Sequence, residues 1–114
     1  MTPDELRKLA DEIEREGTFD GANTAFCKAL GLDSWKFFPI TNLQDAVDAV
    51  PEGYSLSGAR CIEMGAGWRL VKGPMREDTS GCPAGRSKQG NLAAALCAAI
   101  LRAKTAEKEN ESAG

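Results

Sequence analysis

One stretch of the chain consists mostly of alanine and leucine: Asn91-Leu-Ala-Ala-Ala-Leu-Cys97-Ala-Ala-Ile100-Leu-Arg-Ala103. Its larger members recur at helical spacing and form one apolar stripe, made by Leu92, Leu96, Ile100 and Ala103. Asn91 precedes them, and asparagine favours the N-cap position of a helix. The alanines between the stripe residues leave a narrow second face that another element can approach closely. We therefore predict a C-terminal, alanine-rich helix.

Two helical patterns at the N-terminus precede it. The first runs from Pro3 to Glu16, where Thr2 and Glu5 form a capping box and the apolar face comprises Leu6, Leu9, Ala10 and Ile13. The second starts at Asp20 and has the apolar face Ala22, Ala25, Phe26 and Ala29. Gly17 and Gly31 supply the residue type that leaves a helix in a left-handed conformation. These patterns predict an N-terminal helical hairpin.

The chain then carries Trp35, Phe37 and Phe38 directly before Pro39. Three aromatic side chains within four residues are too apolar for a free loop, so we favour a buried crossing over a binding surface. Thr41 with Gln44 repeats the capping box, and the apolar residues after it predict a third helix that Pro51 stops.

Strand-forming residues follow from Tyr54 to Met64 and from Gly67 to Lys72, around the break Gly65-Ala66-Gly67. They predict a β-hairpin. The segment 73–90 is interrupted by glycine and proline, and we expect it to be a long loop. From Glu107 the chain is small and charged. The prediction is one α+β domain over residues 1–106, with a disordered charged tail at residues 107–114.

Composition limits the classes of function. The 114 residues carry 14 basic and 17 acidic side chains, a net charge of -3, which gives no general attraction to nucleic acid. No apolar run approaches the roughly 20 residues that span a bilayer. The chain opens with Met-Thr-Pro-Asp-Glu, which is unlike a secretory signal. The four cysteines could form two disulfides, but we favour reduced thiols and a cytoplasmic location.

The residues of common catalytic and metal sites are missing or badly spaced. The sequence has no histidine and no C-x-x-C pair, so neither a histidine-activated nucleophile nor a zinc site is indicated. We interpret Cys27 and Cys97 as buried thiols and leave the reactivity of Cys82 open. The adjacent carboxylates Glu77 and Asp78 alone make a poor cage for a metal ion. We expect no enzyme activity, no metal and no cofactor.

The segment Gly85-Arg86-Ser87-Lys88-Gln89-Gly90 leads directly into the last predicted helix. Its glycines have the spacing of a P-loop, but Asn91 and Leu92 replace the lysine and hydroxyl residue that nucleotide hydrolysis needs. Backbone N–H groups at the helix start, beside Arg86, Ser87 and Lys88, would suit an anion. A solvated flexible loop is the alternative that we favour.

A second basic cluster surrounds Trp68 and comprises Arg60, Arg69, Lys72 and Arg76. If Trp68 is exposed, its ring could stack on a base while an arginine meets a phosphate. If it is buried, it belongs to the core. The candidate ligand-binding residues are therefore Arg60, Trp68, Arg69, Lys72, Arg76, Arg86, Ser87 and Lys88.

Three pieces in order resemble the phage ABA sandwich family: the helix and turn Leu43–Tyr54 with its Val-Pro-Glu-Gly-aromatic end, Gly67-Trp68 on a strand, and the helix Leu92–Ala103 with its Ala-Leu-Cys-Ala-Ala run. Tyr54 stands where that family usually has tryptophan, and Asn91-Leu92 replaces a threonine-proline opening. The resemblance implies a bacteriophage or prophage origin and a layered α/β/α sandwich. It carries over no catalytic residues.

Two hypotheses follow. The first is a non-enzymatic accessory protein that sequesters a small anionic ligand of a nucleotide-derived kind, as a phage would use against host defence. The second is an interaction module that inhibits or recruits a host protein. The alanine-lined face of the last helix would suit such contacts, including those of a homo-oligomer.

Overall fold

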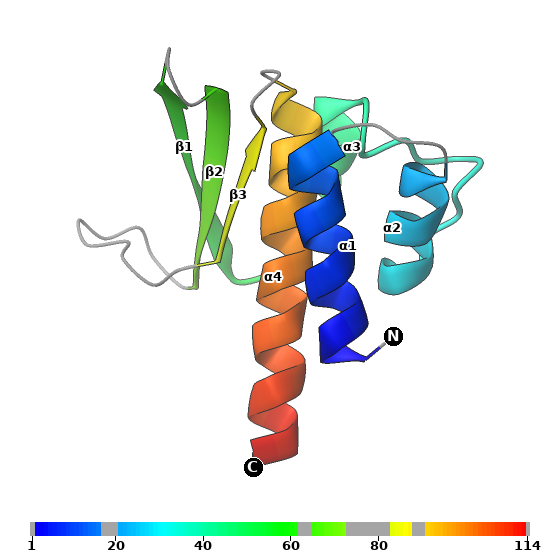
Figure 1. Ribbon diagram of the computed structural model, residues 1–114, viewed down its shortest axis with the longest axis vertical. Coiled ribbons are helices and arrows are strands. Elements are labelled where there is room, and N and C mark those ends of the chain that lie inside the picture. The colour runs from blue at the N-terminus through cyan, green and yellow to red at the C-terminus, as the bar shows by residue number, and fades with distance from the viewer. Residues whose placement is uncertain (1, 17–20, 62–64, 73–82, 88–90, 114) are drawn as a thin grey trace.

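The computed structural model describes residues 2–16, 21–61, 65–72, 83–87 and 91–113, and the side chains of all of these except 57–61, 65–66, 72, 87 and 110–113. The elements are α1 (Pro3–Glu16), α2 (Ala22–Leu30), α3 (Leu43–Asp48), β1 (Tyr54–Cys61), β2 (Gly65–Lys72), β3 (Ala84–Ser87) and α4 (Leu92–Ala113). This is the predicted α+β class, with N-terminal helices, a small antiparallel sheet and a C-terminal helix (Figure 1).

The N-terminal helices form as their sequence patterns indicate. In α1, the Glu5 N–H donates to Thr2 Oγ1 over 3.2 Å, and the four predicted apolar residues are the buried ones. The helix α2 buries Ala22, Phe26 and Cys27, and Gly31 ends it with a φ of 73°. The predicted start at Asp20 and the role of Gly17 lie outside the described residues.

The cap of α3 lies one residue later than predicted. Asn42 has an extended backbone and its Oδ1 accepts the Asp45 N–H over 3.2 Å. Thr41 belongs to the preceding turn, in which the N–H groups of both Thr41 and Asn42 donate to the Phe38 carbonyl. Gln44 reaches forward to Asp48 over 3.1 Å instead of back to a cap.

The three strands form one antiparallel sheet in the order β1-β2-β3. Cys61 pairs with Gly65, so the glycines that we predicted as a break belong to β2. The predicted loop 73–90 also contains a strand, since β3 pairs with β2 from Ala66–Ser87 to Arg69–Ala84. We did not predict β3 from local propensity, because its packing against α4 stabilises this strand.

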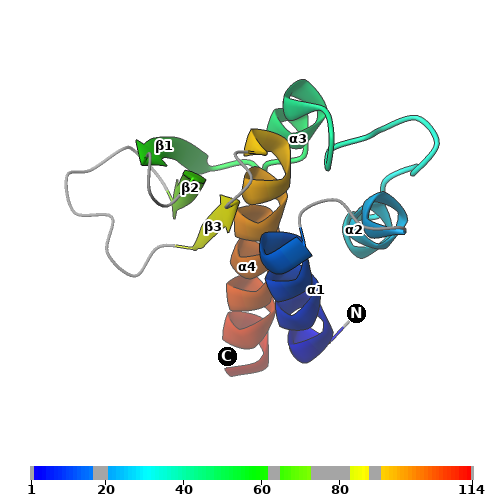
Figure 2. The ribbon, with the colours of Figure 1, turned by 45° about the horizontal axis from the view of Figure 1, so that its top comes forward.

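The helix α4 lies between the sheet and α1 (Figures 1 and 2). The described helices lie on one side of the sheet in both views (Figures 1 and 2). The helix begins as predicted, with the Ala94 N–H donating to Asn91 Oδ1 over 3.1 Å. All its alanines from Ala93 to Ala103 are buried, so both apolar faces are covered within the chain.

The expected disordered tail is instead the last part of α4, which continues to Ala113. Two contacts that the sequence does not reveal hold it. The Tyr54 hydroxyl donates to Glu107 over 3.1 Å, and Arg7 of α1 forms an ion pair with Glu109. Both contacts join the tail to elements that are distant in the sequence.

Candidate functional site

Four large apolar side chains are exposed around the connection between α2 and α3. The exposed fraction is 72% for Trp35, 49% for Phe38 and 37% for both Phe37 and Leu43. We call these four residues the aromatic surface. Our prediction that Trp35, Phe37 and Phe38 are buried was wrong, because the chain turns here with Pro39 and Ile40 directed inward instead.

The backbone that carries the aromatic surface is anchored at both of its sides. The Asn23 side chain of α2 donates to the carbonyls of Ser34, over 3.2 Å, and Phe37, over 2.9 Å. From the other side, the Phe38 N–H donates to Asp45 of α3 over 2.9 Å. The aromatic side chains therefore extend from a fixed segment, and binding through them would order little of the backbone.

Charged groups lie beside this surface and are mostly acidic. Lys36 lies over the Trp35 ring at 5.1 Å from its centroid and is 4.0 Å from the Asp33 carboxylate. On α3, Asp45 is half-buried and Asp48 is exposed. Aromatic rings within a polar rim are the usual composition of a protein-binding surface.

Trp68 is one of the predicted ligand-binding residues. It is half-buried against the core, and its indole N–H donates to the Leu92 carbonyl over 3.1 Å. This hydrogen bond joins β2 to the start of α4. This agrees with the core alternative.

The predicted anion-binding segment 85–90 begins on β3, and its residues 88–90 lie outside the described residues. Gly85 is buried in β3, where a Cβ atom would lie 2.0 Å from the Ala95 carbonyl oxygen of α4. Its glycine character serves close strand–helix packing, and Gly85 belongs to a strand. Arg86 is exposed, and its backbone N–H donates to Glu14 over 3.2 Å.

The other predicted residues are placed less fully. Arg69 is half-buried on β2 and is a diagonal neighbour of Arg86, because it pairs with Ala84. Arg60, Lys72 and Ser87 fall on β1, β2 and β3, but their side chains lie outside the described residues. Arg76, Glu77, Asp78, Cys82 and Lys88 lie outside the described residues altogether.

The two described thiols, Cys27 and Cys97, are free and fully buried. Burial raises the pKa of the Cys97 thiol, and the neighbouring Cys27 raises it further. The pKa of Cys27 is also raised, first by burial and then by Asp33 and Asp45. Both are therefore protonated and poor nucleophiles near neutral pH. Among the described residues, no group of three or more potential ligands could hold a metal ion.

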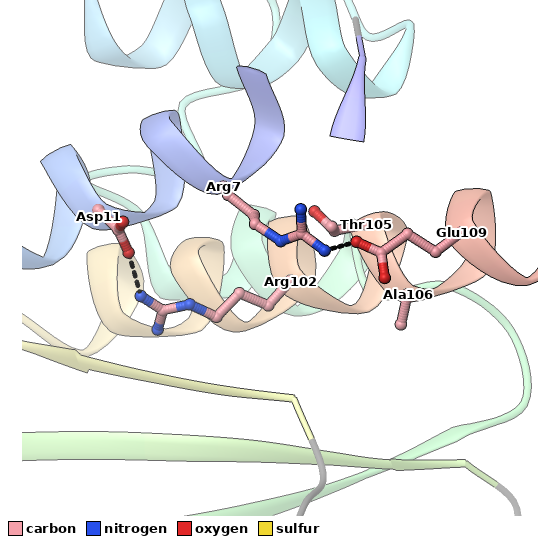
Figure 3. A pocket seen from close by; sticks show the side chains of 6 residues that line it. All are labelled: Arg7, Asp11, Arg102, Thr105, Ala106 and Glu109. Carbon is pink, nitrogen blue, oxygen red and sulfur yellow. Dashed lines mark hydrogen bonds and ion pairs between the residues drawn. The ribbon is translucent and has the colours of Figure 1, made fainter. Parts of the chain in front are cut away.

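A polar hollow of about 260 Å³ lies between α1 and the last turns of α4 (Figure 3). The Arg102 guanidinium reaches Asp11 over 2.8 Å and the Ala84 carbonyl over 2.6 Å, and it is also paired with Glu14. Burial lowers the Arg102 pKa, but the hydrogen bonds to Glu14 and Asp11 raise it more. Each arginine of the hollow is already paired with carboxylates, so this cluster joins α1, β3 and α4.

Comparisons with family models, with curated proteins and with solved structures found no match. The resemblance to the phage ABA sandwich family therefore stays a prediction. None of the helices in the described part of the chain is both long and apolar enough to cross a membrane.

Proposed function

We propose that this protein acts by binding another protein through the aromatic surface, without catalysing a reaction. The observation that carries the proposal is the exposure of Trp35, Phe37, Phe38 and Leu43 on an anchored backbone. Large exposed apolar side chains mark interaction sites in small proteins when they gather on one surface, and tryptophan is enriched among the residues that dominate binding energy.

The alanine face of α4, on which the interaction hypothesis first rested, does not support it. That face is covered by the sheet on one side and by α1 on the other. The aromatic surface replaces it as the proposed contact. The resemblance to a phage family favours a host protein in the cytoplasm as the partner, which the module would inhibit or recruit.

The experiment is photo-crosslinking in a bacterial host. A photoreactive phenylalanine analogue replaces Phe38, and a matched control protein carries it at Lys8, which is exposed on α1. We expect one discrete crosslinked protein from position 38 and none from position 8. The crosslink should disappear when Trp35→Ser is added. Equal labelling from both positions, or none from position 38, would contradict the proposal.

A second function, sequestration of a small anionic and nucleotide-derived ligand, is proposed on a separate observation. Arg86 is exposed, and Arg69 is its diagonal neighbour on the sheet. Ligand binding to the folded state raises the melting temperature. A panel of mononucleotides, cyclic dinucleotides and ADP-ribose derivatives should give at least one shift that Arg86→Ala removes. A flat response across the panel argues against it.

A further inference from the structure

We infer that the partner of the aromatic surface presents apolar side chains bordered by lysine or arginine. This inference rests on the proposed function and names the chemistry of the partner. Its basis is the distribution of charge, which differs sharply between the part of the chain that contains the aromatic surface and the rest.

The whole chain has 14 basic and 17 acidic side chains. Residues 29–59 contain one of the basic ones, Lys36, and four acidic ones, Asp33, Asp45, Asp48 and Glu52. The remaining residues therefore hold 13 of each sign, and two of these cations, Lys28 and Arg60, directly flank the stretch. A balanced body with one acidic, aromatic region matches a basic partner surface.

The local contacts strengthen this asymmetry. Lys36 is the single cation of the stretch, and it lies beside Asp33 and over the Trp35 ring. Asp48 is exposed on α3, a helix that has no basic residue in its last turn. A protein that docked on the aromatic rings would therefore meet the carboxylates of Asp33 and Asp45, which contact Lys36 and the Phe38 N–H, at the edge of the contact, where rim charges steer association.

The same charges argue against two other occupants. A second copy of this chain would bring its own acidic stretch against this one, and juxtaposed like charges oppose association. An anionic membrane surface attracts basic segments, so an acidic rim would weaken insertion of the rings. We therefore commit to a basic, apolar protein surface, and the other occupants become outcomes of the test.

The test uses the full chain and two fluorescent amphipathic peptides of equal length. One has a leucine face and a lysine face, and the other has a leucine face and a glutamate face. Fluorescence anisotropy should show binding of the lysine peptide alone. Trp35→Ser should raise the Kd about tenfold, and Asp48→Lys about fivefold. Glu12→Lys makes the same charge change on exposed α1 and should leave the Kd unchanged.

Several outcomes would overturn the inference. These are equal binding of the two peptides, no binding of either, or the same effect from Asp48→Lys and Glu12→Lys. Sedimentation that shows a Trp35-dependent dimer would favour a second copy, and binding to anionic vesicles would favour a membrane. The proposed function fails separately, because a Phe38 crosslink to an acidic partner would keep it while removing the basic-partner inference.

Discussion

The absence of a side chain at Gly85 allows β3 to pack closely against α4. The backbones of β3 and α4 come so close that an added Cβ would lie 2.0 Å from the Ala95 oxygen and 2.5 Å from the Ala99 nitrogen. Backbone atoms of a packed helix cannot move aside as a flexible side chain can. The strand and the helix would have to separate along the central contact of the fold.

We predict that Gly85→Ala lowers the free energy of unfolding by about 3 kcal/mol, the upper part of the range for overpacked cores. Gly53→Ala is the matched control, since Gly53 has a φ of 88° and no atom near its Cβ position. It should cost only about 1 kcal/mol of backbone strain. Urea unfolding followed by circular dichroism measures both. A Gly85→Ala protein as stable as Gly53→Ala would refute the close packing.

At the scale of elements, the end of α4 is the clearest case of structure set by distant residues. The charged sequence from residue 107 has no apolar face of its own. It is nevertheless helical, and Tyr54 and Arg7 contact it through Glu107 and Glu109. The Tyr54 hydroxyl belongs to β1 and the Arg7 guanidinium to α1, and both elements are distant from the tail in the sequence. Tertiary contacts thus extend a helix that the sequence pattern ends earlier.

Removing residues 107–114 should destabilise the protein by about 1 kcal/mol, because a half-buried hydrogen bond and a partly exposed ion pair contribute modestly. The melting temperature should fall by roughly 4 °C, and the fold should persist. Glu107→Gln with Glu109→Gln in the full-length chain tests whether these two contacts account for the change. An unchanged melting temperature after truncation would show that the tail contributes nothing.

At the scale of the whole molecule, burial of ionisable groups in one small core couples its stability to alkaline pH. Burial first, then neighbouring groups, raises the pKa of Cys27 and Cys97 above the ordinary value of 9.0. Burial and the hydrogen bond to Glu107 raise the pKa of Tyr54 above 10.0. The unfolded chain therefore loses these protons at a lower pH than the folded protein does.

The sign of the effect follows from this difference. The stabilisation is fully present below about pH 9 and is lost as the pH rises toward the folded pKa values. Each affected group contributes a slope of up to about 1.4 kcal/mol per pH unit. Urea midpoints at about pH 7, 9, 10 and 11 measure the loss. The Cys27→Ala, Cys97→Ala double variant should flatten the slope between about pH 9 and 10. An identical slope would assign it to other groups.

The sequence by itself determined the features that local physics controls. Helical periodicity gave the faces of α1 and α2, and the caps at Thr2 and Asn91 fixed where α1 and α4 begin. The apolar spacing of the last helix also predicted its main stripe and a narrow alanine face, but the sequence did not reveal that this second face is covered within the chain. These signals lie within a few residues of one another, so they can be read directly.

Only the tertiary structure decided the rest. Tertiary packing determines that Ala84–Ser87 is a strand and that α4 continues to Ala113. It also determines that Trp68 is partly buried and that the aromatic surface is exposed. Each of these depends on which distant elements pack together, and apolar character alone does not reveal whether space remains in the core. The side chains of α4 and of the elements around it form the core, whereas the rings of Trp35, Phe37 and Phe38 are exposed.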